Sequence, residues 1–322
     1  MDTVTKTSPL TVKPLREDLP FGARIAGLTP ENIMDPAVRQ QLNDVFIERG
    51  MIAFENVEQT AKMQVMISEV FGPLKDHPVK MVERLDNDTL PGVITIRTDP
   101  NAGMVEIDGK KLLTWQPWHF DHSYNNELNR AGVLRAEIIA PEGGLTGFCD
   151  GIQLYNDLPE DIKKKAEGVE VVYSLDLDYS RQPYGLPKNF KEISGKGAAL
   201  AEAAKAIPRS VHPAVWTRET GEKVAHISPY GQREIVGKSH EEGAKLFAEL
   251  WDAVEATITP YFHQWEPGDM VIWDNWRMLH MATGCDPKYD RIMHRTTIKG
   301  DYGLGRWETE PKAPAAAADA MA

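Results

Sequence analysis

The order of apolar and polar residues along the chain predicts three amphipathic helices. The first lies between Asp35 and Gly50, the second between Thr60 and Gly72, and the third over residues 240–257. In each segment apolar side chains recur every three or four residues, which is the spacing of one helix face. Ser239 and Glu242 add a capping box at the start of the third helix. These local signals set both the position and the buried face of the helices.

Short apolar runs predict buried strands over residues 51–54, 136–140 and 270–273. The strands lie mostly in the middle and at the end of the chain, with the helices outside them. This mixture predicts a fold of the α+β class, with a β-rich core decorated by helices.

Residues 158–210 depart from this pattern because they are charged and interrupted by prolines and glycines. Within them, residues 198–206 are rich in alanine and predict a short helix. We interpret the segment as a long, lid-like insertion in a single domain of residues 1–310. Residues 311–322 are almost entirely alanine and proline, which predicts a disordered tail outside the fold.

The 322 residues are 42% hydrophobic and 26% charged, as is typical of a soluble globular protein. The 36 basic and 48 acidic residues give a net charge of −12, which disfavours binding to nucleic acid or to an anionic membrane. There is no secretory signal and no long apolar run, and Cys149 and Cys285 form no disulfide or zinc pattern. We therefore expect a cytoplasmic protein that acts on a small molecule, and a homo-oligomer remains open.

The tetrapeptide Trp118-His119-Phe120-Asp121 carries the strongest chemical signal. In an extended strand, residues two apart share a face, so His119 and Asp121 present an imidazole and a carboxylate side by side. His280 follows an apolar run and offers a third ligand. Two histidines and one carboxylate form the facial triad that binds iron(II) in non-haem oxygenases. For each histidine alone, the alternative is a structural role in the core.

Two arginines follow His280. Arg291 and Arg295 are four residues apart in a strand-like segment, so their side chains share one face. A guanidinium is a permanent cation that can capture a carboxylate with two hydrogen bonds. The alternative is a solvated pair on an exposed strand.

Further short motifs surround these residues: Phe21-Gly22-Ala23-Arg24-Ile25, Glu69-Val70-Phe71-Gly72, Gly143-Gly144-Leu145-Thr146 and Trp273-Asp274-Asn275. Together with the W-H-x-D tetrapeptide, the second histidine and the two arginines, their order resembles the TauD/TfdA (taurine dioxygenase) family of iron(II)- and 2-oxoglutarate-dependent oxygenases. The resemblance covers most of the chain, up to Gly300-Asp301.

The resemblance implies a double-stranded β-helix, a cupin-like jelly-roll core, in which His119, Asp121 and His280 bind Fe(II). It also implies that the distal carboxylate of the cosubstrate 2-oxoglutarate pairs with Arg291 and the hydroxyl of Thr146. An anion buried in a closed pocket needs such a charged partner. Arg295 would lie close to the metal and contact either 2-oxoglutarate or an anionic group of the prime substrate.

The implied reaction uses O₂ to decarboxylate 2-oxoglutarate to succinate and CO₂ while an unactivated C–H bond of the prime substrate is hydroxylated. Desaturation and ring closure remain open as outcomes. Related halogenating enzymes lack the carboxylate ligand, so Asp121 argues against halogenation.

The resemblance further assigns substrate contacts to His77, Trp115, His122, Tyr124 and a residue near His226. Trp115 replaces a polar contact of taurine enzymes, so we expect a small organic anion with an apolar or aromatic body. Alternation along the strand instead turns His122 away from the iron, and core packing is the alternative for Trp115 and Tyr124.

Three alternatives stay open at this point. One is a zinc-dependent hydrolase that uses the same His119, Asp121 and His280 site. Another is a jelly-roll binding protein without enzymatic activity. The third keeps the oxygenase but has Arg295 contact only 2-oxoglutarate or the protein, which leaves the prime substrate neutral.

Overall fold

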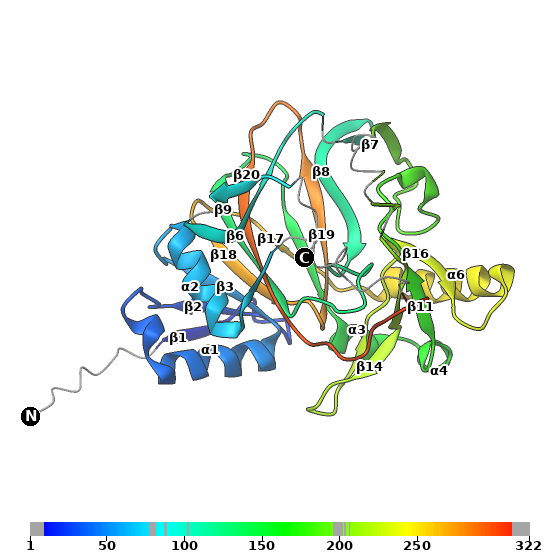
Figure 1. Cartoon of the computed structure of the whole chain (residues 1–322), viewed down its shortest axis with the longest axis horizontal. Coiled ribbons are helices and arrows are strands. Elements are labelled where there is room, and N and C mark those ends of the chain that lie inside the picture. Colours follow the sequence, from blue (N-terminus) through cyan, green and yellow to red (C-terminus); the bar gives the residue numbers. More distant parts are fainter. Residues whose placement is uncertain are drawn as a thin grey trace, which may run out of the picture.

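The computed structural model describes residues 10–76, 82–86, 89–101, 103–195, 202, 204–205 and 207–310. Within these residues two large sheets dominate the fold (Figure 1). The larger sheet runs β1 (Thr11–Pro14), β2 (Ala23–Ala26), β3 (Met51–Glu55), β18 (Met270–Asp274), β9 (Ala131–Ile138), β20 (Ile292–Ile298), β6 (Leu90–Arg97) and β5 (Arg84–Asp86), with β4 (Leu74–Lys75) beside β20.

The second sheet has the order β12 (Lys191–Ser194), β7 (Met104–Ile107), β8 (Lys110–His119), β19 (Met278–Cys285), β10 (Thr146–Asp150) and β17 (Tyr261–His263). The strands β8, β9 and β10 alternate between the two sheets, and so do β17, β18, β19 and β20. Apolar side chains of both sheets form one buried cluster, which includes Phe148 of β10 and Trp273 of β18. The two sheets therefore pack face to face.

The remaining strands of the described residues form two smaller sheets. One has the order β16 (Gln232–Ile235), β11 (Glu170–Tyr173), β13 (Ser210–Pro213) and β21 (Arg306–Trp307), and the other pairs β14 (Val215–Thr217) with β15 (Lys223–Ala225). The helices are α1 (Pro36–Arg49), α2 (Ala61–Phe71), α3 (Gly151–Asp157), α4 (Glu160–Ala166) and α6 (His240–Thr257), with the 3-10 turns η1 (Asn32–Met34) and η2 (Tyr179–Arg181).

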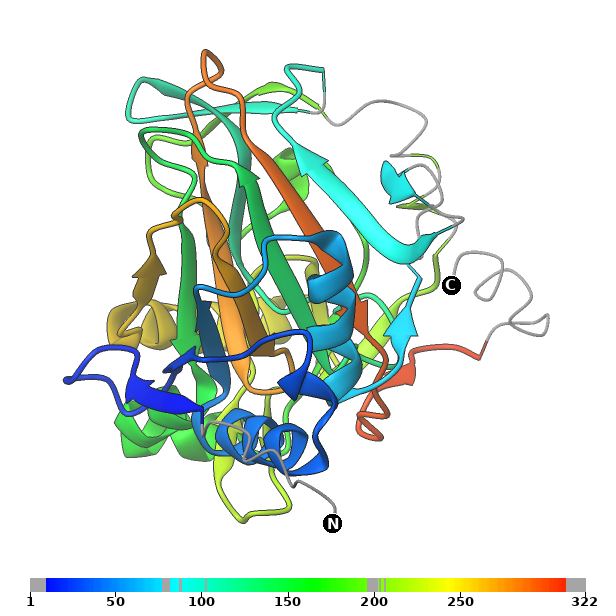
Figure 2. The ribbon, with the colours of Figure 1, turned by 90° about the vertical axis from the view of Figure 1, so that its left-hand side faces the viewer.

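The three predicted helices are confirmed as α1, α2 and α6, and their predicted caps are formed. The Asp35 side chain accepts from Ala37 N, the Thr60 side chain accepts from Met63 N, and the capping box of Ser239 is complete. Apolar residues of α1 and α2 pack on the larger sheet. The ribbons of both helices, in blue, lie in front of this sheet in Figure 2. These two helices cover the face of that sheet that points away from the second sheet.

The predicted strands 51–54 and 270–273 are confirmed as β3 and β18, whereas the strand predicted at 136–140 begins earlier, as β9. The first residues of β9 pair with both β18 and β20 at the centre of the larger sheet. These partners are distant in the sequence, so a local apolar run could not predict where the strand begins. Among the described helices, none is both long and apolar enough to cross a membrane.

The segment 158–210, which we interpreted as a lid-like insertion, contains two parts that pack in different places. Its first part, α4 and β11, joins a third apolar cluster together with α6, and its later part supplies η2 and β12. Strand β12 extends the second sheet by pairing with β7. Most of the helix predicted at 198–206 and the tail 311–322 lie outside the described residues.

Candidate active site

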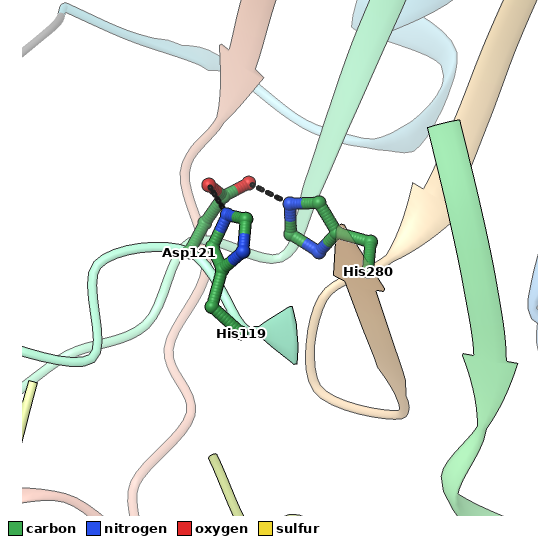
Figure 3. A group of neighbouring side chains, drawn as sticks. All are labelled: His119, Asp121 and His280. Atoms are coloured by element: carbon green, nitrogen blue, oxygen red, sulfur yellow. Dashed lines mark ion pairs between the residues drawn. The ribbon is translucent and has the colours of Figure 1, made fainter. Parts of the chain in front are cut away.

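The side chains of His119 and Asp121 meet that of His280, from a distant part of the chain, at one end of β8. Residue His119 ends this strand, and the register of β8 with β19 sets His280 directly opposite it. The ligand atoms of His119, His280 and Asp121 all lie within 4.8 Å of one another, and the three residues are buried (Figure 3). The candidate metal site therefore depends on a strand pairing between segments far apart in the sequence.

The carboxylate reaches this position through a turn. The prediction that His119 and Asp121 share one extended strand is wrong, because β8 ends at His119 and Asp121 lies in the turn that follows. Asn275 holds this turn in place: Asp121 N donates to Asn275 Oδ1 (2.7 Å), and Asn275 Nδ2 donates to Asp121 O (3.1 Å). Asn275 belongs to the Trp273-Asp274-Asn275 motif, but the sequence alone assigned it no role.

The protonation states suit metal binding. Burial lowers the pKa of His119 to about 3, so its imidazole is neutral near pH 7. Its Nδ1 lies 2.8 Å from the carbonyl oxygen of Pro117, which fixes the proton on Nδ1 and leaves the Nε2 lone pair facing the cluster. Burial alone would raise the pKa of Asp121, but Arg295 and the two histidines hold it well below its usual range. The site thus presents neutral imidazole and ionised carboxylate.

Arg295 lies against the ligand carboxylate. Its Nη1 donates to Asp121 Oδ1 (3.1 Å), and its Nη2 donates to Asp121 Oδ2. The guanidinium also lies over the ring of Trp273, 5.5 Å from the centroid. Its Nε has no hydrogen-bond partner among the described residues. The structure therefore gives Arg295 a contact with the protein beside the triad.

A cavity of about 710 Å³ opens on the triad. His119, His280, Thr146, Arg291 and Arg295 all line it, so the structure brings together the predicted metal and cosubstrate residues. Other lining residues come from the segment 158–210: Tyr179, Glu192 and Ser194. The cavity is thus closed on one side by part of the predicted insertion.

Arg291 is a buried cation with no carboxylate partner in the described parts of the chain. Its side chain is nearly inaccessible, at 6% exposure, and burial lowers its pKa to about 10. Cys285 is the one titratable group that acts on it among the described residues, and burial raises the pKa of this thiol, so it is uncharged near pH 7. A charge buried in this way is costly unless an anion joins it. This guanidinium is therefore positioned to receive an anion from the cavity.

The glycines of the Gly143-Gly144-Leu145-Thr146 motif make room for this guanidinium. Gly144 has a φ of +66°, and a Cβ there would lie 2.8 Å from Arg291 Nε. Gly143 has a φ of +72°, and its Cβ would lie 2.9 Å from the carbonyl oxygen of Gly284. Any larger residue would push the arginine or the neighbouring strand away, because left-handed backbone at close approach favours glycine.

Only some of the residues predicted to contact the prime substrate line the cavity. Trp115 lines the cavity, whereas His122, Tyr124 and His226 are buried but are not among its lining residues. His226 stacks on Phe120 at 3.8 Å between ring centroids. His77 lies outside the described residues. Of these predicted contacts, the cavity supports Trp115.

The sequence did not single out Tyr179, which completes the wall that Trp115 begins. Its hydroxyl donates to the backbone oxygen of Trp115 (3.1 Å), and the two rings meet edge to face at 5.5 Å. Phe190 packs on both rings, at 5.2 Å from Trp115 and 5.3 Å from Tyr179. The proline- and glycine-rich context of these residues gave no periodic signal that could have placed them at the site.

Comparison with known proteins finds the family model described as taurine catabolism dioxygenase TauD, TfdA family, which matches residues 11–297. The chain is 28% identical over 284 residues to an (S)-phenoxypropionate/alpha-ketoglutarate-dioxygenase of Sphingobium herbicidovorans, covering 88% of this chain and 93% of the relative. It is 27% identical over 285 residues to an alpha-ketoglutarate-dependent 2,4-dichlorophenoxyacetate dioxygenase of Burkholderia sp., covering 87% and 92%.

Solved structures agree in fold. A taurine dioxygenase from Burkholderia xenovorans superposes with a TM-score of 0.66 at 24% identity, covering 91% of both chains. AAD-2 in complex with Mn(II) and N-oxalylglycine gives a TM-score of 0.68 at 19% identity, covering 95% of this chain and 100% of the other. These similarities extend over nearly the whole described fold.

Proposed function

Because this chain belongs to the taurine catabolism dioxygenase TauD, TfdA family and is an α-ketoglutarate (2-oxoglutarate)-dependent dioxygenase, we propose that it uses iron(II) to hydroxylate a small organic anion. In this reaction 2-oxoglutarate loses CO₂ to become succinate, and an unactivated C–H bond of the prime substrate takes up oxygen. The observation that carries the proposed cosubstrate site is the buried Arg291, which lines the same cavity as the two triad histidines and has no carboxylate partner among the described residues.

The strand order supports a double-stranded β-helix for the core of this enzyme. The larger sheet contains the order β18-β9-β20-β6, and the second sheet contains β8-β19-β10-β17. Strands β8 to β10 and strands β17 to β20 alternate between the two sheets, as the winding of a jelly roll requires. In this arrangement the ligand-bearing strands β8 and β19 are neighbours.

The donor set of the triad supports a metal of the non-haem iron class. Two imidazoles and one ionised carboxylate, clustered beside a cavity, are the ligands that such an ion prefers, and they would leave positions free for the cosubstrate and O₂. Iron(II) held there supplies the oxidative chemistry of the reaction. The protein's own part is to keep the ligands deprotonated, fix their orientation and exclude water. The alternative of a zinc hydrolase gives no function to Arg291 and Thr146, which line the same cavity.

Arg291 and Thr146 are the proposed anchors of the distal carboxylate of 2-oxoglutarate. A carboxylate that enters beside Arg291 replaces the water this guanidinium lost on burial, and the pair forms a charge-assisted hydrogen bond. Thr146 lines the same cavity and adds a hydroxyl. Both residues are buried, so their interactions with an anion are only weakly screened by solvent.

The buried charges around the triad favour an anionic prime substrate. Arg291 and Arg295 outnumber the single carboxylate Asp121, so a divalent ion together with dianionic 2-oxoglutarate leaves one positive charge unbalanced. Other charged residues also line the cavity, but they are partly or fully exposed and water screens them: Glu83, Arg97, Asp99 and Glu192. A carboxylate or sulfonate near Arg295 would neutralise the site.

The apolar wall of Trp115 and Tyr179 supports a substrate with a flat or bulky apolar body. Both rings are at least nine-tenths buried and line the cavity, and aromatic faces of this kind pack best on apolar or aromatic groups. We propose the same combination, an acid group and an aromatic body, that the names of the phenoxypropionate and dichlorophenoxyacetate relatives describe.

A paired panel of substrates tests this assignment. Aryloxy carboxylates and sulfonates are compared with their neutral amides, and succinate formation is measured for the wild type, Arg295→Ala and Arg295→Gln. We expect the wild type to prefer the acids and both variants to lose that preference. Arg97→Ala is the matched control, because Arg97 lines the cavity but is exposed and paired with Glu83.

Binding of iron(II) and 2-oxoglutarate is followed separately, by the weak visible charge-transfer band of the anaerobic complex. This measurement distinguishes loss of substrate anchoring from damage to Asp121. Equal turnover of acid and amide by the wild type would exclude an anionic substrate. An Arg295→Ala enzyme that still prefers the acid would exclude Arg295 as the anchor.

A further inference from the structure

Trp265 lies behind the proposed cosubstrate site and outside the residues that line the cavity. It follows β17, whose His263 is the register partner of Thr146 on β10. The indole Nε1 donates to Thr146 Oγ1 at 3.1 Å, and Trp265 is 9% exposed. The one contact of this indole N–H with the active site is therefore the hydroxyl of Thr146.

This hydrogen bond determines what the hydroxyl can do. An indole N–H can only donate, so Trp265 occupies an acceptor position of Thr146 Oγ1 and cannot take its proton. Among the described residues, no hydrogen-bond acceptor is assigned to that proton. With one of its two acceptor positions occupied by the indole, the hydroxyl can direct its own proton toward the cavity as a donor, which is the role an incoming carboxylate requires.

The indole itself is held rigidly. Its ring meets the ring of His263 edge to face at 4.5 Å, and His263 Nε2 donates to Asp269 Oδ2 at 3.0 Å. Tyr261 OH lies 3.2 Å from the other nitrogen of His263. Trp265 also belongs to the apolar cluster between the two sheets. Rotation of the indole away from Thr146 would break its contact with the fixed His263 ring and its packing in this cluster.

We propose that Trp265 is a positioning residue that orients the Thr146 hydroxyl as a donor to the distal carboxylate of 2-oxoglutarate. The inference rests on the proposed function, because it takes Thr146 as a cosubstrate contact. It goes further in assigning the orientation of that hydroxyl to a residue that touches neither the metal nor the cosubstrate. The interaction is specific to a cosubstrate that ends in an acceptor group.

The test is a double-mutant cycle on 2-oxoglutarate affinity, with Trp265→Phe, Thr146→Val and the double variant. Affinity is measured in the anaerobic iron(II) enzyme by titration of the visible band and by calorimetry. We expect Trp265→Phe to raise the Kd for 2-oxoglutarate about threefold to tenfold, the effect of one lost hydrogen bond. In the Thr146→Val background the same change should have no further effect.

Two controls separate positioning from a general structural effect. Trp251→Phe removes a buried indole N–H that has no hydrogen-bond partner among the described residues, and it should leave the Kd unchanged. 2-Oxopentanoate keeps the keto acid of the cosubstrate but lacks its distal carboxylate. Its Kd should be the same in the wild type and in Trp265→Phe.

The other possible outcomes distinguish failure of the positioning role of Trp265 from failure of the proposed cosubstrate contact of Thr146. If Thr146→Val weakens 2-oxoglutarate binding and Trp265→Phe does not, the positioning role is overturned while the proposed function stands. If Trp265→Phe weakens binding equally with and without Thr146, or weakens 2-oxopentanoate as well, the indole acts through the fold and the positioning role is also overturned. If Thr146→Val leaves the Kd unchanged, the cosubstrate contact of Thr146 fails, and the inference fails with it.

Discussion

Replacing Arg291 by methionine should stabilise the protein without ligands and at the same time abolish tight binding of 2-oxoglutarate. The two effects share one cause, because Arg291 is buried and has no carboxylate partner in the part of the chain that the structure describes. A residue kept for binding and not for folding is expected to act in opposite directions on the two properties.

The magnitudes follow from the burial of the guanidinium. Lowering its pKa from the ordinary value to about 10 corresponds to roughly 3 kcal/mol of unfavourable free energy for the charged form. Methionine keeps most of the apolar stem, so the free energy of unfolding of the ligand-free enzyme should rise by about 1–3 kcal/mol. Loss of the charged partner of a buried carboxylate should weaken 2-oxoglutarate binding by about 2–5 kcal/mol, or at least thirtyfold in Kd.

Two assays measure these effects on the same samples. Urea unfolding of the metal-free enzyme gives the free energy of unfolding, and titration of the anaerobic iron(II) complex gives the Kd for 2-oxoglutarate. Arg277→Met is the matched control. Arg277 is 3% exposed and donates to both oxygens of Asp150, at 2.5 and 2.9 Å. Its loss leaves a buried carboxylate alone and should destabilise the protein by about 3–5 kcal/mol.

Either of two results would contradict the role of Arg291 as the partner of the cosubstrate carboxylate. If Arg291→Met destabilises the ligand-free enzyme as much as Arg277→Met does, Arg291 has a structural partner and is not held in reserve for an anion. If Arg291→Met binds 2-oxoglutarate within about threefold of the wild type, the distal carboxylate lies elsewhere, since even one neutral hydrogen bond is worth that much.

Three further predictions concern the triad, the cavity wall and acid stability. Alanine at His119, Asp121 or His280 should abolish iron-dependent turnover and lower the bound metal while the far-UV circular dichroism stays unchanged; near-wild-type turnover by a folded variant removes that residue from the triad. Tyr179→Ala should raise the kcat/KM ratio of bulky to small substrates by about tenfold, and Tyr179→Phe should not; an unchanged ratio for Tyr179→Ala would exclude Tyr179 from the substrate wall. Burial lowers the pKa of His212 to about 4, below the ordinary value of about 6.5, so the unfolded chain takes up the proton first and stability is lost as the pH falls below 6.5. Between pH 6.5 and 5 this loss should be about 1.5 kcal/mol in urea unfolding, and the same slope in His212→Gln would contradict the assignment.

The helices and the candidate chemistry could be predicted because their signals are local. Asp35, Thr60 and Ser239 start their helices through hydrogen bonds to backbone amides two or three residues away, so neighbouring residues in the sequence are enough to recognise them. The W-H-x-D tetrapeptide and the spacing of Arg291 and Arg295 are visible for the same reason.

The contacts that could not be predicted from the sequence depend on pairings between distant segments. His280 faces His119 because β19 and β8 pair in one particular register, and a shift by one residue would turn the imidazole to the other face of the sheet. Asn275 reaches Asp121 only after the two sheets have folded against each other, and Trp265 reaches Thr146 only after β17 has paired with β10.

The charge state of the site was also decided by the tertiary structure. The sequence presents Arg291 and Arg295 as equivalent cations on one strand face, yet Arg295 is paired with Asp121 and Arg291 is buried without a carboxylate. Alternation along a strand determines which way side chains point, whereas burial and the nearest opposite charge come from elements elsewhere in the chain. Residue types and their spacing therefore identified the groups that could do the chemistry, and the packing of the two sheets set which cation has no carboxylate partner among the described residues.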